Sequence, residues 1–293
     1  MIKGKVLTIK NKNIAIGFFG IPRSIRFTKE SIYTNILDPI KSEYNTKIFC
    51  HFIQQEAISN PRTGEYTKIS QRDYNEMASD QTRLTSEFDP NLMRYLLKLK
   101  KFGDVNNDNY RSLNNLINQL YSMRQLTNEI EQEGYDICLF VRPDLRYHDS
   151  MISVIDLAYR CSSDTVFLPE WQPWRGLNDR FAVCVGKKAI RAYGKRILSA
   201  ENYCKYSMSP LNSERLLQFS LRENNISIKK IPNRASRVRA DGVEVDEDFS
   251  LAHHLPTSER IKSSIYESGV RLSEITRTKS VLRTLGSWIT EKH

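Results

Sequence analysis

An arginine and an aspartate stand where a buried strand is expected to end. Residues 137–141 carry no charge, which is typical of a strand buried on both faces of a sheet, and Arg142, Pro143 and Asp144 follow directly. Pro143 cannot continue the strand, because it has no backbone N–H to donate. Ligands of open α/β sheets bind outside the carboxyl ends of the strands. Arg142 is therefore a candidate for binding phosphate oxygens and Asp144 for holding a divalent cation, with an ordinary turn as the competing interpretation.

A second candidate region is the loop that precedes residues 181–185. Trp171 and Trp174 offer aromatic faces on which a sugar or a base can stack. Asn178 and Asp179 end the loop, and a carboxylate at Asp179 can accept a proton from an attacking hydroxyl. The alternative is a packed loop in which Asp179 caps the next element.

A third candidate is Glu214, which follows Asn212 and Ser213. Either Asn212 or Ser213 fits the N-cap of a helix, and Glu214 then fits the first turn, where the helix dipole favours a carboxylate. Taken alone, Glu214 is better explained by this structural role than by catalysis. The order of the three regions along one chain is what favours a shared site.

Apolar and amphipathic segments alternate along the chain. Strands are predicted at residues 14–19, 47–53, 137–141, 165–168, 181–185 and 226–231, and helices at 27–37, 91–102, 111–133, 150–161, 187–198 and 214–222. Residues 54–89 are polar and rich in turn formers, which predicts an irregular excursion over the face that carries the strand ends. This alternation predicts an α/β fold with a mostly parallel, doubly wound sheet flanked by helices.

Composition favours a globular protein without a membrane span. The 293 residues are 40% hydrophobic and 27% charged, and no apolar run approaches the roughly 20 residues that cross a bilayer. The N-terminus leads into the first strand without the apolar core of a signal peptide, so we expect a cytoplasmic location. Five scattered cysteines are expected to be reduced, and five histidines show no metal-ligand spacing beyond His253 and His254.

The net charge favours anionic partners. Lys and Arg number 44 against 34 Asp and Glu, a formal charge of +10, with basic clusters at residues 187–196 and 229–239 and an acidic segment at 241–248. The rival interpretation is a basic nucleic-acid-binding protein without catalytic activity. Such a protein usually shows an RRM aromatic signature, zinc-finger spacing or a KH loop, and none is found. A P-loop is also absent from the sequence.

Six short motifs occur in an order that resembles a family of bacterial and viral polysaccharide glycosyltransferases. The resemblance covers roughly residues 14–242. The motifs are Phe19-Gly20-x-x-Arg23, Gln119-x-Tyr121-Ser122, Arg142-Pro143-Asp144-Leu145, Gly176-x-Asn178-Asp179-Arg180-Phe181, Ser213-Glu214 and Arg237-Val238-Arg239-Ala240-Asp241-Gly242.

The resemblance implies a GT-A-type catalytic domain over residues 1–250. It implies transfer of a sugar, of hexosyltransferase type, from a nucleotide-diphosphate sugar such as a UDP-sugar to a hydroxyl of a glycan or a lipid-linked saccharide in surface polysaccharide or glycan synthesis. No nucleic acid partner is expected.

The metal motif of the family is incomplete in this sequence. The resemblance implies an Asp-x-Asp motif that holds Mn²⁺ or Mg²⁺, but Arg142 occupies the first Asp position and Asp144 alone matches the second. Two accounts stay open. Either Asp144 holds the cation with the diphosphate and water, or Arg142 supplies the positive charge and no metal is needed.

The resemblance also implies roles for individual residues. Asp179 corresponds to the acidic residue beside the acceptor and is the expected general base. The residues expected to bind the donor are Gly20, Arg23, Gln119, Tyr121, Arg142, Asp144, Arg237 and Arg239. Those expected to bind the acceptor are Trp171, Trp174, Asn178 and Glu214.

Residues 251–293 are expected to form a basic, helical C-terminal extension. One helical stripe carries Val281, Leu282, Leu285, Trp288 and Ile289, with basic residues nearby. Docking on the catalytic domain is the favoured interpretation. The alternative is peripheral contact with the inner face of an anionic membrane, which fits an enzyme that extends a lipid-linked glycan.

Overall fold

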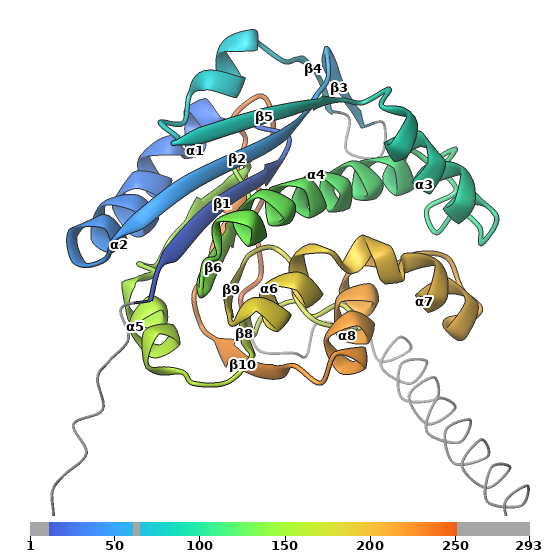
Figure 1. Cartoon of the computed structure of the whole chain (residues 1–293). Coiled ribbons are helices and arrows are strands. Elements are labelled where there is room, and N and C mark those ends of the chain that lie inside the picture. The colour runs from blue at the N-terminus through green and yellow to red at the C-terminus, as the bar shows by residue number, and fades with distance from the viewer. Residues whose placement is uncertain (1–11, 61–64, 251–293) are drawn as a thin grey trace, which may run out of the picture. The chain divides into compact units, whose positions relative to one another are not determined.

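A central sheet organises the computed structural model, which describes residues 12–60 and 65–250 (Figure 1). Within these residues the sheet has seven strands in the order β10-β8-β9-β6-β1-β2-β5. The strands are β1 (Ile14–Gly20), β2 (Thr46–Gln54), β5 (Gln81–Ser86), β6 (Ile137–Val141), β8 (Thr165–Pro169), β9 (Ala182–Val185) and β10 (Ser227–Ile231).

The sheet is mostly parallel, which confirms the predicted fold class. β1 runs parallel to β2 and β6, β2 to β5, and β8 to β10. β9 is reversed and pairs antiparallel with both β6 and β8. The chain passes from β8 to β9 through a loop without a crossover helix, and such a connection returns the chain in the opposite direction. That loop is the tryptophan-containing segment of the sequence.

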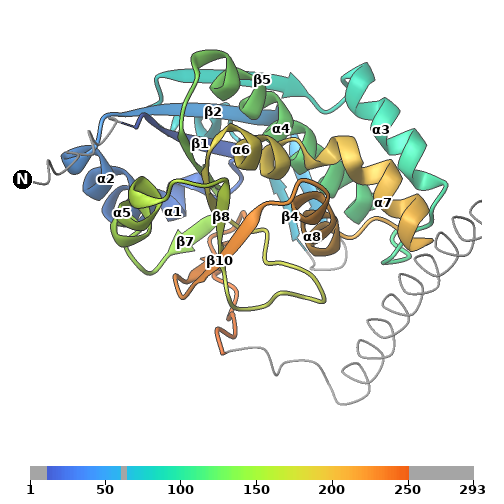
Figure 2. The ribbon, with the colours of Figure 1, turned by 60° about the horizontal axis from the view of Figure 1, so that its bottom comes forward.

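Helices cover both faces of the sheet (Figures 1 and 2). One face packs against α1 (Ile25–Ile32), a π-helical turn (Tyr33–Leu37), α2 (Asp38–Glu43) and α5 (Ile152–Arg160). The other packs against α4 (Arg111–Glu133), α6 (Lys187–Gly194) and α8 (Ser213–Glu223). A third apolar cluster joins the N-terminal half of α4 to α3 (Pro90–Lys100) and α7 (Ala200–Ser207). The sheet is therefore the middle layer of three.

The alternation of side chains along β1 explains both apolar layers. Ile14, Ile16 and Phe18 belong to the first cluster, whereas Ala15 and Phe19 belong to the second. α4 crosses β1 so closely that a Cβ atom on Gly17 would lie 2.7 Å from Leu126 Cδ2.

α4 has the bounds that its apolar periodicity predicts. It spans Arg111–Glu133 and ends at Gly134, whose φ of 78° and N–H bond to the carbonyl of Ile130 form a left-handed cap. This helix leads directly into β6 and thus positions Arg142 and Asp144.

Residues 54–89 are more regular than the sequence predicts. They contain a hairpin of β3 (Ala57–Asn60) and β4 (Glu65–Lys68), a 3₁₀ turn (Gln71–Asn75) and the edge strand β5. The region does contribute to the cleft described below, but its strands were not predicted. β5 in particular is an edge strand with mostly exposed side chains, so it lacks an apolar pattern.

Two predicted helices are broken by local changes in backbone. The helix expected at 187–198 ends at Gly194 and continues as a 3₁₀ turn (Arg196–Ser199) before α7. The segment expected as one helix at 27–37 is α-helical up to the end of α1 (Ile25–Ile32) and π-helical over Tyr33–Leu37. A small second sheet, in which β7 (Leu145–Tyr147) pairs with β11 (Ala235–Arg237), brings Arg237 beside the residues that follow β6.

The predicted C-terminal extension, residues 251–293, lies outside the described residues. Among the helices of residues 12–60 and 65–250, none is long and apolar enough to cross a membrane.

Candidate active site

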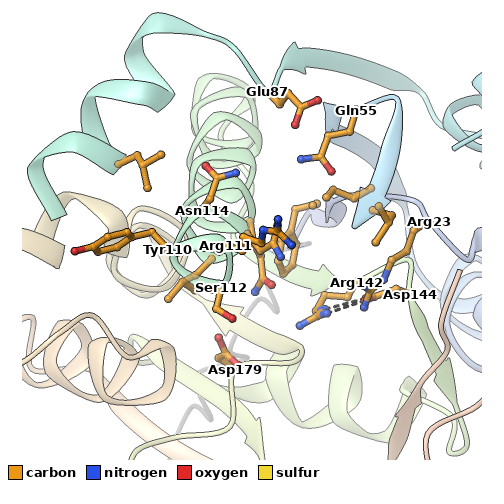
Figure 3. Close-up of a pocket in the computed structure, with 18 of the residues that line it drawn as sticks. Arg23, Gln55, Glu87, Tyr110, Arg111, Ser112, Asn114, Arg142, Asp144 and Asp179 are labelled. Carbon is orange, nitrogen blue, oxygen red and sulfur yellow. Dashed lines mark hydrogen bonds and ion pairs between the residues drawn. The ribbon is translucent and has the colours of Figure 1, made fainter. Parts of the chain in front are cut away.

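A cleft of about 980 Å³ lies beyond the carboxyl ends of β1, β2, β5 and β6 (Figure 3). Its walls come from the β1–α1 loop, the segments after β2, β5 and β6, the N-terminal half of α4, the β8–β9 loop, the start of α8 and β11. These segments are far apart in sequence. The parallel strands bring them to one edge, as expected for the ligand site of an open sheet.

Asp144 is clamped between two arginines at one end of this cleft. Arg142 donates from Nε to Oδ1 at 2.9 Å and from Nη2 to Oδ2 at 2.8 Å, and Arg23 donates from Nη2 to Oδ2 at 2.8 Å (Figure 3). Burial alone would raise the pKa of Asp144, but the two guanidinium groups outweigh it and hold the pKa well below its usual range. Asp144 is thus an ionised counter-ion that orients both arginines.

These residues do not fit a divalent cation. Both oxygens of Asp144 already accept guanidinium N–H groups, and the two positive charges would repel a metal ion. No cluster of three or more His, Cys, Asp or Glu side chains suited to a metal occurs among the described residues. The geometry therefore favours the account in which arginines supply the positive charge.

Glu247 orients a second pair of arginines at the cleft. Its Oε1 accepts from Arg180 Nη1 and from Arg237 Nε, both at 2.7 Å. Arg180 also donates to Gln172 Oε1 at 2.6 Å, and its guanidinium stacks on the Trp171 ring. Burial tends to raise the pKa of Glu247, but hydrogen bonds from Arg180 and Arg237 lower it. Arg180 and Arg237 both line the cleft.

The turn after β1 is fixed by a buried hydroxyl. Gly20 has φ of 99°, a conformation that favours glycine, and its N–H donates to Ser122 Oγ at 2.8 Å. Ser122 in turn donates to the carbonyl of His51, and burial lowers the pKa of His51 to about 4. The neutral imidazole contacts Ser122 through Nδ1 and Thr85 through Nε2. This network joins β1, β2, β5 and α4 beneath the cleft.

Two carboxylates, Asp179 and Glu214, also line the cleft. Asp179 accepts from Arg196 Nη2 at 3.3 Å and from the hydroxyl of Ser213. Burial, followed by the negative charge of Asp179, raises the pKa of Glu214 to about 7. The cleft therefore combines arginines suited to an anion with a carboxyl group whose pKa is suited to proton transfer.

Comparisons with known proteins give distant structural matches. No family model and no curated protein match the sequence. Mouse xyloside xylosyltransferase 1 matches with a TM-score of 0.44 and 10% identity over 75% of this chain and 85% of that one. The galactosyltransferase LgtC, solved with donor and acceptor sugar analogues, gives a TM-score of 0.43 and 10% identity over 73% and 72%.

The glycosyltransferase GlyE of Streptococcus pneumoniae gives a TM-score of 0.41 and 8% identity, over 75% of this chain but 46% of that one. At these TM-scores and identities the matches carry no argument about function.

Most of the residues expected at the site line the cleft. Six are expected donor residues, one is the expected base, and two are expected acceptor residues. They are Gly20, Arg23, Gln119, Arg142, Asp144, Trp174, Asp179, Glu214 and Arg237. Trp174 keeps 44% of its surface exposed and has a left-handed φ of 43°, so its ring is presented by a constrained loop.

Four expected site residues do not line the cleft. Trp171 is buried and its indole N–H donates to the carbonyl of Asn233, while Asn178 donates to the carbonyl of Trp171. Tyr121 is buried and its hydroxyl donates to Asp89. Arg239 lies in a turn that backbone bonds with Gly242 and Val243 close. These side chains shape the loops around the cleft.

Other lining residues were not expected from the sequence. The segments after β2 and β5 contribute Gln55 and Glu87, and the first turns of α4 contribute Tyr110, Arg111 and Asn114 (Figure 3). A polar run at the start of a long amphipathic helix was the available signal for the α4 residues. Nothing in the sequence marked Gln55 and Glu87 as site residues, because their position depends on the pairing of β5 with β2.

Proposed function

We propose that this protein is a glycosyltransferase that uses a nucleotide-diphosphate sugar. The observation that carries the proposal is the cleft at the strand ends, where the clamped arginines Arg23 and Arg142 share one cavity with Asp179 and Glu214. Guanidinium groups bind phosphate oxygens strongly, and a carboxylate can accept a hydroxyl proton. Figure 3 shows Arg142 and Asp179 on separate walls of this space.

In this proposal the diphosphate lies against the arginines. Among the described residues, Arg142 Nη1 makes no hydrogen bond beyond the two that Nε and Nη2 donate to Asp144, and Arg237 reaches the cleft from β11. The negative charge that develops on the leaving diphosphate is stabilised by groups already oriented by Asp144 and Glu247. No step requires a metal ion.

The ring of Trp174 is suited to stacking on a sugar in the same cleft. We infer an acceptor hydroxyl on a glycan or a lipid-linked saccharide, and a UDP-hexose as donor. A cytoplasmic site of action, at the inner face of a membrane, belongs to the same proposal.

The rival function, nucleic-acid binding, has less support. In the described part of the chain, several members of the basic clusters are paired: Arg191 and Lys195 with Glu131, and Arg234 with Asp149. Arg196 is fully buried. These pairs reduce the exposed positive charge of the two clusters.

A donor panel tests the proposal. Thermal unfolding of the full chain is followed with UDP-, GDP-, CMP- and dTDP-sugars, each with and without Mn²⁺. One nucleotide class is expected to raise the melting temperature. Arg142→Met is expected to reduce the shift, whereas Arg234→Gln, which removes an exposed arginine outside the cleft, is expected to keep it. Absence of a shift with every donor would contradict the proposal.

A further inference from the structure

The two carboxylates of the cleft have different surroundings. Asp179 forms an ion pair with Arg196, whose side chain has no exposed surface. The other bonds of this guanidinium go to the carbonyl of Tyr193 at 2.9 Å and to the sulfur of Met123 at 3.0 Å. Neither group carries a charge. Within the described residues, the Arg196 charge is therefore balanced by Asp179.

Asp179 is committed to structural contacts. Its carboxylate is the partner of a fully buried guanidinium, and removing that carboxylate would leave Arg196 buried without a charged partner. Asp179 also accepts the hydroxyl hydrogen of Ser213, the first residue of α8. Its contacts therefore hold Arg196 and the start of α8 in place.

Glu214 is held in the cleft through its backbone. Asn212 Oδ1 accepts from the N–H of Arg215 at 2.9 Å and caps α8. The carbonyl of Glu214 accepts from the N–H of Leu177 at 3.1 Å. The β8–β9 loop packs so tightly here that a Cβ atom on Gly176 would lie 2.3 Å from the carbonyl carbon of Glu214.

The carboxylate of Glu214 makes no ion pair within 4.0 Å among the described residues. The charged groups around it are Asp179 and Arg180 from the β8–β9 loop and Arg196 from the 3₁₀ turn before α7. Burial and the Asp179 charge raise the pKa of Glu214 to about 7, against the opposing effect of the two arginines. A base with a pKa near the working pH is the most effective in proton transfer.

We propose that Glu214 accepts the proton of the attacking hydroxyl, and that Asp179 is a positioning residue. This inference rests on the proposed function. The acceptor oxygen forms a bond to the anomeric carbon, the bond from that carbon to the phosphate oxygen breaks, and its electron pair leaves with the nucleoside diphosphate. The hydroxyl proton moves to the carboxylate of Glu214. The diphosphate leaves as an anion beside Arg142, so one proton acceptor is sufficient.

The test compares Glu214→Gln with Glu223→Gln, a control at the exposed end of the same helix. Release of nucleoside diphosphate from UDP-glucose, UDP-galactose and GDP-mannose is measured with water as the acceptor. Glu214→Gln is expected to lower turnover by about 10²–10⁴-fold. Its affinity for the donor is expected to stay within about threefold of the wild type, because the substitution removes no group that binds the diphosphate. Glu223→Gln is expected to leave both unchanged.

Two pH readouts separate a proton acceptor from a structural role. In the wild type, kcat/KM is expected to rise with pH through about 7. This rise of kcat/KM with pH is expected to be absent in Glu214→Gln and to be partly restored in Glu214→Asp. A ¹³C-carboxyl NMR titration, assigned by the signal that Glu214→Gln loses, is expected to show the same midpoint without any substrate.

The outcomes distinguish this inference from the proposed function. If Glu214→Gln still turned over the donor with the pH dependence of the wild type, the role of Glu214 would be wrong, whereas the proposed transferase function would stand. A midpoint near the ordinary glutamate value of 4.5 would overturn it as well. A wild-type protein that neither binds nor cleaves any of the three sugar nucleotides would defeat the proposed function itself.

Discussion

At the residue scale, the arginines of the cleft depend on buried carboxylates for their orientation. Asp144 is 4% exposed and receives three N–H bonds from Arg142 and Arg23. A guanidinium held in this way loses little freedom when it binds a phosphate. Asp144 thus contributes both to stability and to the preparation of an anion site.

Replacing Asp144 by Asn is expected to destabilise the protein by about 3 kcal/mol at pH 7, since it leaves Arg142 without its carboxylate partner and Arg23 with Glu65 alone. The pKa of Asp144 is lowered on folding, so its contribution is fully present above the ordinary value of 3.8 and is lost as the pH falls below it. The difference between variant and wild type is therefore expected to shrink at pH 3. Urea unfolding at the two pH values measures it.

Asp149→Asn is the matched control. Asp149 pairs with Arg234 on the surface, and the two side chains are 33% and 50% exposed. Its loss is expected to cost less than about 1 kcal/mol. An equal effect of the two substitutions at pH 7 would contradict the role assigned to Asp144.

Glu214→Gln is expected to stabilise the protein at high pH. The pKa of Glu214 is raised on folding, from 4.5 to about 7, so ionisation costs stability progressively as the pH rises between these values. The variant is expected to gain about 1–3 kcal/mol at pH 8 and almost nothing at pH 4. Thermal unfolding at both pH values checks this, with Glu223→Gln as the control that should show no such pH dependence.

At the element scale, the β8–β9 loop and the start of α8 form one unit. The loop has no crossover helix, and its close approach to α8 is what places Glu214 beside Asp179. Contact between two backbones leaves no room for adjustment by a rotamer change. The position of Glu214 is therefore expected to depend on Gly176 more than on any large side chain of the loop.

Gly176→Ala is expected to cost about 2–3 kcal/mol, because its methyl group would overlap backbone atoms of Glu214 and Arg215. Gly17→Ala is a milder comparison: there the methyl group meets the end of the Leu126 side chain, which can move. Denaturant unfolding gives both losses. The interpretation would be wrong if Gly17→Ala were the more damaging substitution.

The sequence predicted those helices and strands whose buried apolar side chains form a continuous run or recur at helical spacing. The apolar run of β6 located Arg142 and Asp144, and the apolar periodicity of α4 gave its bounds, whereas Gln119 was expected only from the family resemblance. β5 carries no such pattern, because its side chains face solvent at the sheet edge. The sequence also could not predict the contact between Arg23 and Asp144. The two residues are 121 positions apart, and they meet because β1 pairs with β6.

At the scale of the whole molecule, the formal charge of +10 favours anionic partners. The cleft gathers Arg23, Arg142, Arg180 and Arg237, and the described carboxylates that pair with them are Glu65, Asp144 and Glu247. Lys100 and Arg111 also line the cleft, as do Glu87, Asp179 and Glu214, so its lining carries six basic and four acidic side chains.

Calorimetric titration of UDP, or of the diphosphate that the donor panel selects, into the full chain tests the central claim most directly. The claim is that arginines, rather than a metal ion, bind the diphosphate. The affinity is expected to be the same in EDTA and in Mn²⁺, and Arg142→Met is expected to weaken it by about tenfold or more, as for the loss of a charge-assisted bond. Binding that disappears in EDTA and returns with Mn²⁺, or that Arg142→Met leaves unchanged, would contradict the account.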